Sequence, residues 1–374
     1  MTEPAELAWI VPGDPAQNTG GYRYDARIVA GLRARGWPVT VHGLDGRFPR
    51  ADDTARESLS TTLASLPDGA AVVIDGLALG GLPEPAQAEA KRLKLLALVH
   101  HPLADETPGQ PPELELVDSE RTALAACRAV AVTSPFTARR LSELALYPGP
   151  VAVITPGVEP ADEAASAAAL ARDGQLHRQA RWLCVASLTP RKGHACLLDA
   201  LAGLDGDWQL TLIGSRERAP EHAAGLKNQA ERLGLSGRLV WLGETDEAKL
   251  TDSYHQADLC LIPSHYEGYG MVVTEALARG IALVSTTGGA LADTVPTDAA
   301  LRVAPSDVAS LRQALARWLD EPDLRQRLAR SALTRRQELS DWPCSIERFE
   351  RWLWTNLAPA RLDPPAPDDQ PDTQ

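Results

Sequence analysis

The chain has 374 residues, of which 44% are hydrophobic and 23% charged, and its net charge at pH 7 is −13. This length and composition predict a soluble protein of roughly two domains. The acidic balance excludes bulk nucleic-acid binding and a polybasic membrane anchor, because both need a basic surface. No apolar run approaches the ~18 residues of a membrane span, and the N-terminus carries acids where a signal peptide carries basic residues. We therefore expect a cytoplasmic protein.

Short apolar runs alternate with stretches of helical period along the chain, which is typical of βαβ units and a parallel sheet. In the first half these runs predict strands at residues 7–11, 39–44, 71–75, 95–100, 129–134 and 151–155. In the second half they predict strands at residues 182–188, 208–214, 238–243, 259–264, 282–286 and 301–304. Because strongly twisted open sheets rarely exceed ~10 strands, we predict two doubly wound α/β domains rather than one large sheet.

The boundaries between these units follow from composition. Residues 156–180 have no strand character and are rich in Pro, Ala and acids, as in a linker with about one helical turn. A helix over 321–338 should stop before Trp342-Pro343 and resume over 345–356. We predict a first domain at 1–160, a linker at 161–180, a second domain at 181–340, a closing helix at 341–357 and a disordered Pro- and Asp-rich tail at 358–374.

The segment HYEGYGMVVTEALARG, after the strand ending near 264, is the most informative loop. It sets Glu267 and Glu275 eight positions apart around Gly268 and Gly270, where a strand turns into a helix. Glycines there let a ligand approach the backbone, and free N–H groups at residues 269–272 suit a phosphate or diphosphate. The two carboxylates suit sugar or ribose hydroxyls. In the alternative interpretation Glu275 only complements the helix dipole and Glu267 is a solvated loop residue.

Two cations follow the first strand of the second half, in the segment SLTPRKGH. Arg191 and Lys192 lie just before a helix that should begin near Gly193. A diphosphate suits this pair, because Arg binds two oxygens in parallel and Lys acts as a point charge. The alternative is a solvated pair on the surface.

The first half carries two further candidate sites. Gly20 and Gly21 lie between a strand and an amphipathic helix, in a loop that a ligand could approach closely. The fourth strand ends at His100 and His101, and such a histidine could contact a substrate hydroxyl or stabilise developing charge. A metal at this pair would need two more ligands at suitable spacing, which the sequence does not offer.

Several cofactor motifs are absent from the sequence. It has no G-x-G-x-x-G and no G-x-x-x-x-G-K-[ST], so a nicotinamide enzyme and a P-loop nucleotidase lose their main support. The cysteines are dispersed without a C-x-x-C pair, which predicts reduced thiols rather than a zinc site.

Taken together, PSHYEGYGMVVTEALARG, the upstream Arg-Lys-Gly loop and the Gly-Gly segment resemble the retaining glycosyltransferases of family 4, over roughly residues 7–355. The resemblance implies the GT-B fold, in which two Rossmann-like domains face each other across a cleft and the nucleotide-sugar donor lies mainly on the second. It implies that Glu275 holds the ribose. It also implies that the donor sugar and diphosphate are contacted by Glu267, Gly268, Tyr269, Gly270 and Met271.

By the same resemblance Arg191 and Lys192 neutralise the leaving diphosphate, and His100 faces the sugar near the reacting carbon, with His101 as the weaker candidate. Gly20 and Gly21 approach the phosphate from the acceptor side. No metal or other cofactor is expected, because the helix N-terminus and the two cations do a metal's work.

The sequence departs from the family pattern at two places. An Arg that the family often has a few residues before the Lys is replaced here by Ala186-Ser187, so we assign Ser187 to the donor loop and expect Arg191 to substitute. The Pro-Asn-Gly common at the end of the first domain is Thr155-Pro156-Gly157.

The expected reaction is transfer of a sugar from a nucleoside diphosphate sugar, with uridine favoured, to a hydroxyl of a soluble small molecule or glycan. The acidic, Pro-rich segment 101–118 lacks the basic amphipathic character of a lipid-facing surface. Two alternatives remain open on the same scaffold: a nucleotide-sugar epimerase or phosphorylase, and a catalytically silent sugar-nucleotide-binding protein.

Overall fold

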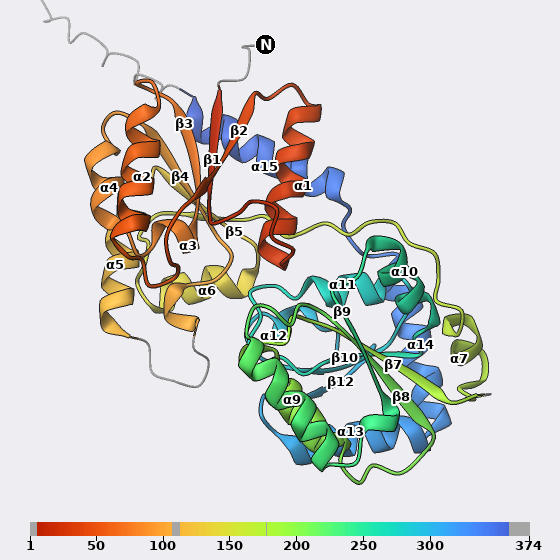
Figure 1. Cartoon of the computed structure of the whole chain (residues 1–374). Coiled ribbons are helices and arrows are strands. Elements are labelled where there is room, and N and C mark those ends of the chain that lie inside the picture. Colours follow the sequence, from red (N-terminus) through yellow and green to blue (C-terminus); the bar gives the residue numbers. More distant parts are fainter. Residues whose placement is uncertain (1–5, 107–112, 177, 359–374) are drawn as a thin grey trace, which may run out of the picture.

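The chain folds into two parallel six-stranded sheets, each with helices packed on it (Figure 1). This computed structural model describes residues 6–106, 113–176 and 178–358. The two sheets confirm the predicted α/β fold class, and each predicted strand is present. No helix in the described ranges is long and apolar enough to cross a membrane.

The first sheet has the strand order β2-β1-β3-β4-β5-β6. Its strands are β1 (Leu7–Pro12), β2 (Val39–Leu44), β3 (Ala71–Asp75), β4 (Lys94–Val99), β5 (Ala129–Val132) and β6 (Val151–Val153). The order reverses between β1 and β3, and ligands of such sheets bind outside the carboxyl ends of the strands at this point. The loops after β1 and β3 are therefore where the first sheet can offer a site.

The second sheet has the order β12-β11-β10-β7-β8-β9. Its strands are β7 (Ala180–Val185), β8 (Trp208–Ile213), β9 (Leu239–Gly243), β10 (Leu259–Ile262), β11 (Leu283–Thr286) and β12 (Ala300–Val303). Here the order reverses between β7 and β10. The two loops that the sequence singled out, after β7 and after β10, thus start from neighbouring strands.

The helices fill the connections between successive strands. In the first half they are α1 (Gly20–Ala34), α2 (Asp53–Ser65), α3 (Gly76–Leu79), α4 (Pro83–Glu89), the 3₁₀ turn η1 (Leu103–Asp105), α5 (Leu114–Ala125) and α6 (Pro135–Glu143). In the second they are α7 (Ala167–Asp173), the turn η2 (Pro190–Lys192), α8 (His194–Leu201), α9 (Pro220–Arg232), the turn η3 (Ser236–Arg238), α10 (Glu247–Gln256), α11 (Met271–Leu277), α12 (Leu291–Thr294), α13 (Val308–Asp320), α14 (Pro322–Arg336) and α15 (Trp342–Leu357).

The strand sequences are continuous apolar runs because helices bury both faces of each sheet. On one face of the first sheet the core includes Leu59 and Leu63 of α2. On the other face α1 and α15 pack together, with the Phe349 ring centroid 5.3 Å from that of Trp9 in β1. The last helix thus returns to the first sheet and lies beside α1 (Figure 1).

Helix α15 begins at Trp342, within one residue of the predicted closing-helix segment 341–357 but three residues before the stretch 345–356 where the helix was expected to resume. Pro343 was expected to interrupt the helix, but a proline in the first turn is tolerated because its missing N–H would have no helical partner there. Asp341 caps the helix by accepting a hydrogen bond from the Cys344 N–H at 3.0 Å. The predicted disordered tail lies outside the described residues except for Ala358, and the acceptor segment 101–118 is described only outside 107–112.

Candidate active site

The loops after β7 and β10 meet because their backbones pass unusually close to each other. Gly193, which ends η2, has a φ of 70°, and a Cβ there would lie 2.0 Å from the backbone oxygen of Pro263. Only glycine fits both this conformation and this space. In addition, the His265 N–H donates to the backbone oxygen of Arg191 at 2.8 Å. These contacts bring the predicted cations beside the predicted carboxylate.

Lys192 and Glu267 form a largely buried ion pair in which the lysine Nζ lies 2.7 and 2.8 Å from the two carboxylate oxygens. The Ser264 hydroxyl donates to Glu267 at 2.7 Å. Burial lowers the pKa of Lys192, although Glu267 partly offsets this. Burial alone would raise the pKa of Glu267, but Lys192 and Arg191 outweigh it and the pKa is lowered. Lys192 is therefore not the free cation that the sequence suggested but half of a charge pair.

Glu275 lies on α11 and makes two polar contacts, one within its own domain and one across to the other. It accepts a hydrogen bond from the Tyr254 hydroxyl at 2.8 Å and forms an ion pair with Arg23 of α1 at 3.1 Å. The Glu275 side chain is 12% exposed. It is thus a carboxylate held by tyrosine at the boundary of the two domains rather than one that only complements the helix dipole.

Gly20 and Gly21 form the first turn of α1 and not the predicted loop, because Thr19 is the residue that precedes the helix in extended conformation. A Cβ on Gly20 would lie 3.8 Å from the Met271 sulfur, and one on Gly21 would lie 3.4 Å from the His100 ring. The pair thus lets the start of α1 approach both His100 and the start of α11.

His100 directly follows β4 and is held by two carboxylates that the sequence interpretation missed. Its Nε2 lies 3.2 Å from Asp25 of α1 and 3.4 Å from Asp75 at the end of β3. Burial would lower the pKa of His100, but the two carboxylates outweigh it and raise the pKa to about 10. The imidazole is therefore positively charged at neutral pH. Within the described parts of the chain, these three residues form the group that could offer three ligand atoms to a metal ion.

His101 faces Glu106, and their side chains form a second ion pair. Burial would raise the pKa of Glu106, but His101, together with Arg191 and Lys192 of the second domain, lowers it to about 2. The predicted cations thus lower the pKa of a carboxyl group in the other domain.

The remaining predicted residues lie on the two loops of the second domain. Ser187 lies between β7 and η2, and Met271 starts α11. Tyr269 accepts a hydrogen bond from the Thr294 hydroxyl through its backbone oxygen, and Gly270 has a φ of 90°.

Gly268 lies against the backbone of the loop after β4 in the first domain. A Cβ at Gly268 would lie 2.4 Å from the backbone oxygen of His100. Because a backbone atom cannot swing away, Gly268→Ala is expected to force the loops apart at a cost of about 1–3 kcal/mol. Small-angle scattering should show a larger radius of gyration. Gly225→Ala in α9, whose Cβ would meet nothing within 4 Å, is the control and should leave it unchanged; equal radii for both variants would contradict the close approach.

Glu120 of α5 supports the turn η1, because its carboxyl oxygen accepts a hydrogen bond from the Leu103 N–H at 3.0 Å. Burial raises the pKa of Glu120 to about 8. Between about pH 4.5 and 8 the folded state keeps a proton that the unfolded state releases, so stability should fall as pH rises. Glu120→Gln should remove a slope of about 1.4 kcal/mol per pH unit, measured by urea unfolding at pH 5.5 and 8. An unchanged pH dependence would contradict this.

The missed residues had a recognisable signal. Asp75 ends the apolar run AVVID, and carboxyl ends of strands are where ligands bind, so the rule used for the other loops also applies to it. No sequence pattern marks Asp25 as clearly, because its distance to His100 depends on how α1 packs against the sheet.

Residues 171–335 match the protein family described as glycosyl transferases group 1. The chain is 39% identical to the glycogen synthase of Mycobacterium tuberculosis over 118 residues, which cover 31% of this chain and 28% of that protein. It is 29% identical to the D-inositol 3-phosphate glycosyltransferase of Thermomonospora curvata over 264 residues, which cover 64% of this chain and 59% of that protein. The chain thus spans less than two thirds of the length of these relatives.

Solved structures match over almost the whole chain. The sucrose-phosphate synthase of Thermosynechococcus elongatus superposes with a TM-score of 0.77 at 21% identity, covering 94% of this chain and 99% of that one. The HepE protein of Anabaena, solved with UDP and glucose, superposes with a TM-score of 0.71 at 16% identity, covering 94% and 100%. Two parallel sheets of this kind are the fold of GT-B glycosyltransferases. The chain therefore has the GT-B fold, and its residues 171–335 match the glycosyl transferases group 1 family.

Proposed function

We propose that this protein is a retaining glycosyltransferase of family 4 that moves a hexosyl group from a nucleoside diphosphate sugar, a UDP-sugar in the first place, to a hydroxyl of a soluble small molecule or glycan. The observation that carries the proposal is the placement of Lys192, Glu267 and Glu275 around the point where the second sheet reverses its strand order. That the HepE protein was solved with UDP supports the choice of base.

Each of these side chains has a task in the proposed reaction. The bond from the anomeric carbon to the diphosphate oxygen breaks, a bond to the acceptor oxygen forms, and the acceptor proton leaves with the diphosphate. Negative charge develops on the leaving diphosphate, where Lys192 and Arg191 stabilise it. Glu267 holds Lys192 in position and contacts the donor sugar, and Glu275 accepts hydrogen bonds from the ribose. No metal ion has a part in this scheme.

The first domain supplies the opposite side of the site. His100, charged and fixed by Asp25 and Asp75, faces the donor sugar across Gly21. Because Asp25 and Asp75 hold the imidazole in one orientation before the reaction, His100 needs no reorganisation as the transition state forms.

A panel of nucleoside diphosphates and nucleotide sugars, followed by thermal shift, tests the proposal. A ligand at 100 times its dissociation constant stabilises the folded protein by ~2.7 kcal/mol. We expect one nucleotide-sugar series to raise the melting temperature and to yield a glycoside whose anomeric configuration, read by NMR, matches the donor. An epimerised donor without an acceptor, or binding without product across a broad acceptor panel, would replace the proposal by the epimerase or by the silent binding protein.

A further inference from the structure

A tyrosine of the second domain is buried in the first. Tyr266 lies in the loop between β10 and α11, yet its ring packs edge-on against His101 and Phe136, with centroid separations of 5.9 Å in both cases. Both neighbours belong to the first half of the chain, on the loop after β4 and on α6. Tyr266 is only 7% exposed. The ring is therefore inserted between two elements of the opposite domain.

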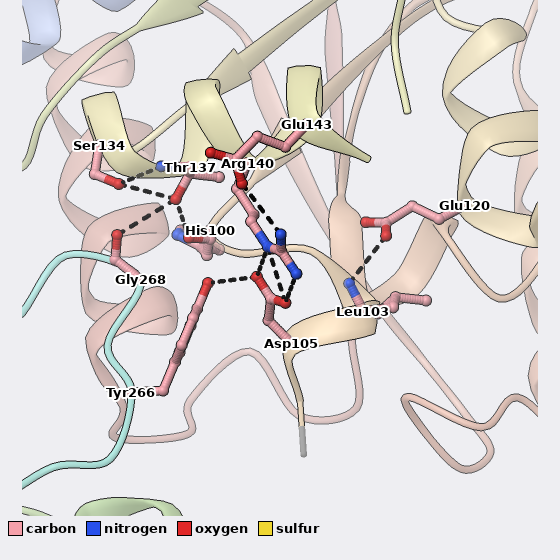
Figure 2. A network of polar contacts seen from close by, with 10 residues as sticks. All are labelled: His100, Leu103, Asp105, Glu120, Ser134, Thr137, Arg140, Glu143, Tyr266 and Gly268. Atoms are coloured by element: carbon pink, nitrogen blue, oxygen red, sulfur yellow. Dashed lines mark hydrogen bonds and ion pairs between the residues drawn. The ribbon is translucent and has the colours of Figure 1, made fainter. Parts of the chain in front are cut away.

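The Tyr266 hydroxyl binds the Asp105 carboxylate, which is also bound by an arginine of the first domain (Figure 2). It donates to Asp105 Oδ2 at 3.0 Å. Arg140 of α6 binds the same carboxylate through its Nε and through a terminal nitrogen, at 3.0 Å each. The carboxylate that accepts from the tyrosine is thus held by residues of η1 and α6 alone, both in the first half of the chain. Burial raises the pKa of Tyr266, so the hydroxyl remains a donor.

A second contact between the domains lies next to Tyr266 in the sequence and involves the backbone of Gly268. The Thr137 hydroxyl of α6 is 3.2 Å from the His100 backbone oxygen and 3.4 Å from that of Gly268, so it bridges the two loops (Figure 2). The loop of Glu267 and Gly268 is thereby held on both sides of Glu267: by Tyr266 before it and by Gly268 after it.

Two ion pairs between the domains have at least one more exposed partner, and in the Arg23–Glu275 pair the side chains are 42% and 12% exposed. In the Arg139–Asp293 ion pair the side chains are 54% and 32% exposed, and exposed ion pairs contribute little. Asp105, in contrast, is 9% exposed. A hydrogen bond from a buried hydroxyl to a buried carboxylate is among the stronger kinds. Among these three contacts, only the one from Tyr266 to Asp105 has both partners buried.

We propose that Tyr266 is a positioning residue that couples domain closure to assembly of the donor site. Resting on the proposed function, this inference adds how the site is completed. When the domains close, the ring enters the space between His101 and Phe136 and the hydroxyl binds Asp105. Because Glu267 is the next residue, insertion of Tyr266 fixes the carboxylate that holds Lys192. When the domains open, Tyr266 leaves and Glu267 loses that restraint.

The test is Tyr266→Phe in the full chain, which keeps the ring and removes only the hydroxyl. We expect the ratio of closed to open molecules to fall about tenfold, since a hydrogen bond to a charged group contributes at least that factor. Small-angle scattering should show a larger radius of gyration. With the nucleotide sugar that binds, kcat should fall about tenfold while the donor dissociation constant changes by less than about twofold, because the donor site lies on the second domain.

Tyr147→Phe is the matched control, because the Tyr147 hydroxyl donates to the Arg128 backbone oxygen away from this interface. Asp105→Asn gives a second route to the same contact and should also enlarge the radius of gyration. A Tyr266→Phe variant equal to Tyr147→Phe in radius of gyration and in kcat would overturn the inference. If the wild type binds no nucleotide sugar, the proposed function fails, and the radius of gyration alone decides whether Tyr266 closes the domains.

Discussion

Replacing Lys192 by methionine is expected to lower kcat about 100- to 1,000-fold while changing the donor dissociation constant far less. Removing one preorganised donor from a developing negative charge costs this much in enzymes whose chemistry depends on it. The ground state loses less, because the diphosphate carries less of the developing charge before the bond breaks. Single-turnover rates and donor titration measure the two effects separately.

The structure adds a condition to this expectation. Lys192 is paired with Glu267 at 2.7 Å, so Lys192→Met leaves a buried carboxylate without its partner and should also lower stability. The double variant Lys192→Met with Glu267→Gln should recover that stability without recovering kcat. Lys227→Met on the exposed face of α9 is the control. A Lys192→Met enzyme with kcat within twofold of the control would contradict the role of Lys192.

Glu275→Gln is expected to weaken nucleotide binding about 10- to 100-fold with a smaller effect on kcat. Hydrogen bonds to a charged group contribute about 1.5–3 kcal/mol, and about 1.4 kcal/mol is a factor of ten in affinity. The glutamine keeps the shape of the side chain and its contact with Tyr254 while removing the charge. Titration calorimetry with the nucleoside diphosphate measures the change.

The control for Glu275→Gln is Glu231→Gln, at an exposed position near the end of α9. The ion pair with Arg23 gives a second comparison, because Arg23→Ala removes the group that would compete with a ribose for Glu275. Arg23→Ala should therefore not weaken nucleotide binding. Equal affinities for Glu275→Gln and Glu231→Gln would exclude a ribose contact at Glu275.

Sequence reasoning predicted the sheets well for a physical reason. Strands buried on both faces have continuous apolar sequences, so runs such as AVVID and LCLI mark β3 and β10 without knowledge of the fold. The strand-end rule then pointed to the loops that carry Lys192 and Glu267, which the fold brings together although they are 75 positions apart.

What could not be predicted depends on how elements pack. Asp25 reaches His100 because α1 lies over the end of β4, and Tyr266 reaches Asp105 across 161 positions because the domains approach each other. Neither pair has a spacing that a sequence pattern can detect. The stretch 345–356 also began too late for α15, because Pro343 was taken to interrupt the helix. Recognising Asp341 as the N-cap would have placed that proline in the first turn, where it is tolerated.

A crystal structure of the protein with UDP bound would test the central claim most directly, which is that the loops after β7 and β10 form the donor site. We predict that the diphosphate lies within hydrogen-bond distance of Lys192 Nζ and that the ribose hydroxyls bind the Glu275 carboxylate. UDP bound away from both side chains, with Lys192 still paired only to Glu267, would contradict the account.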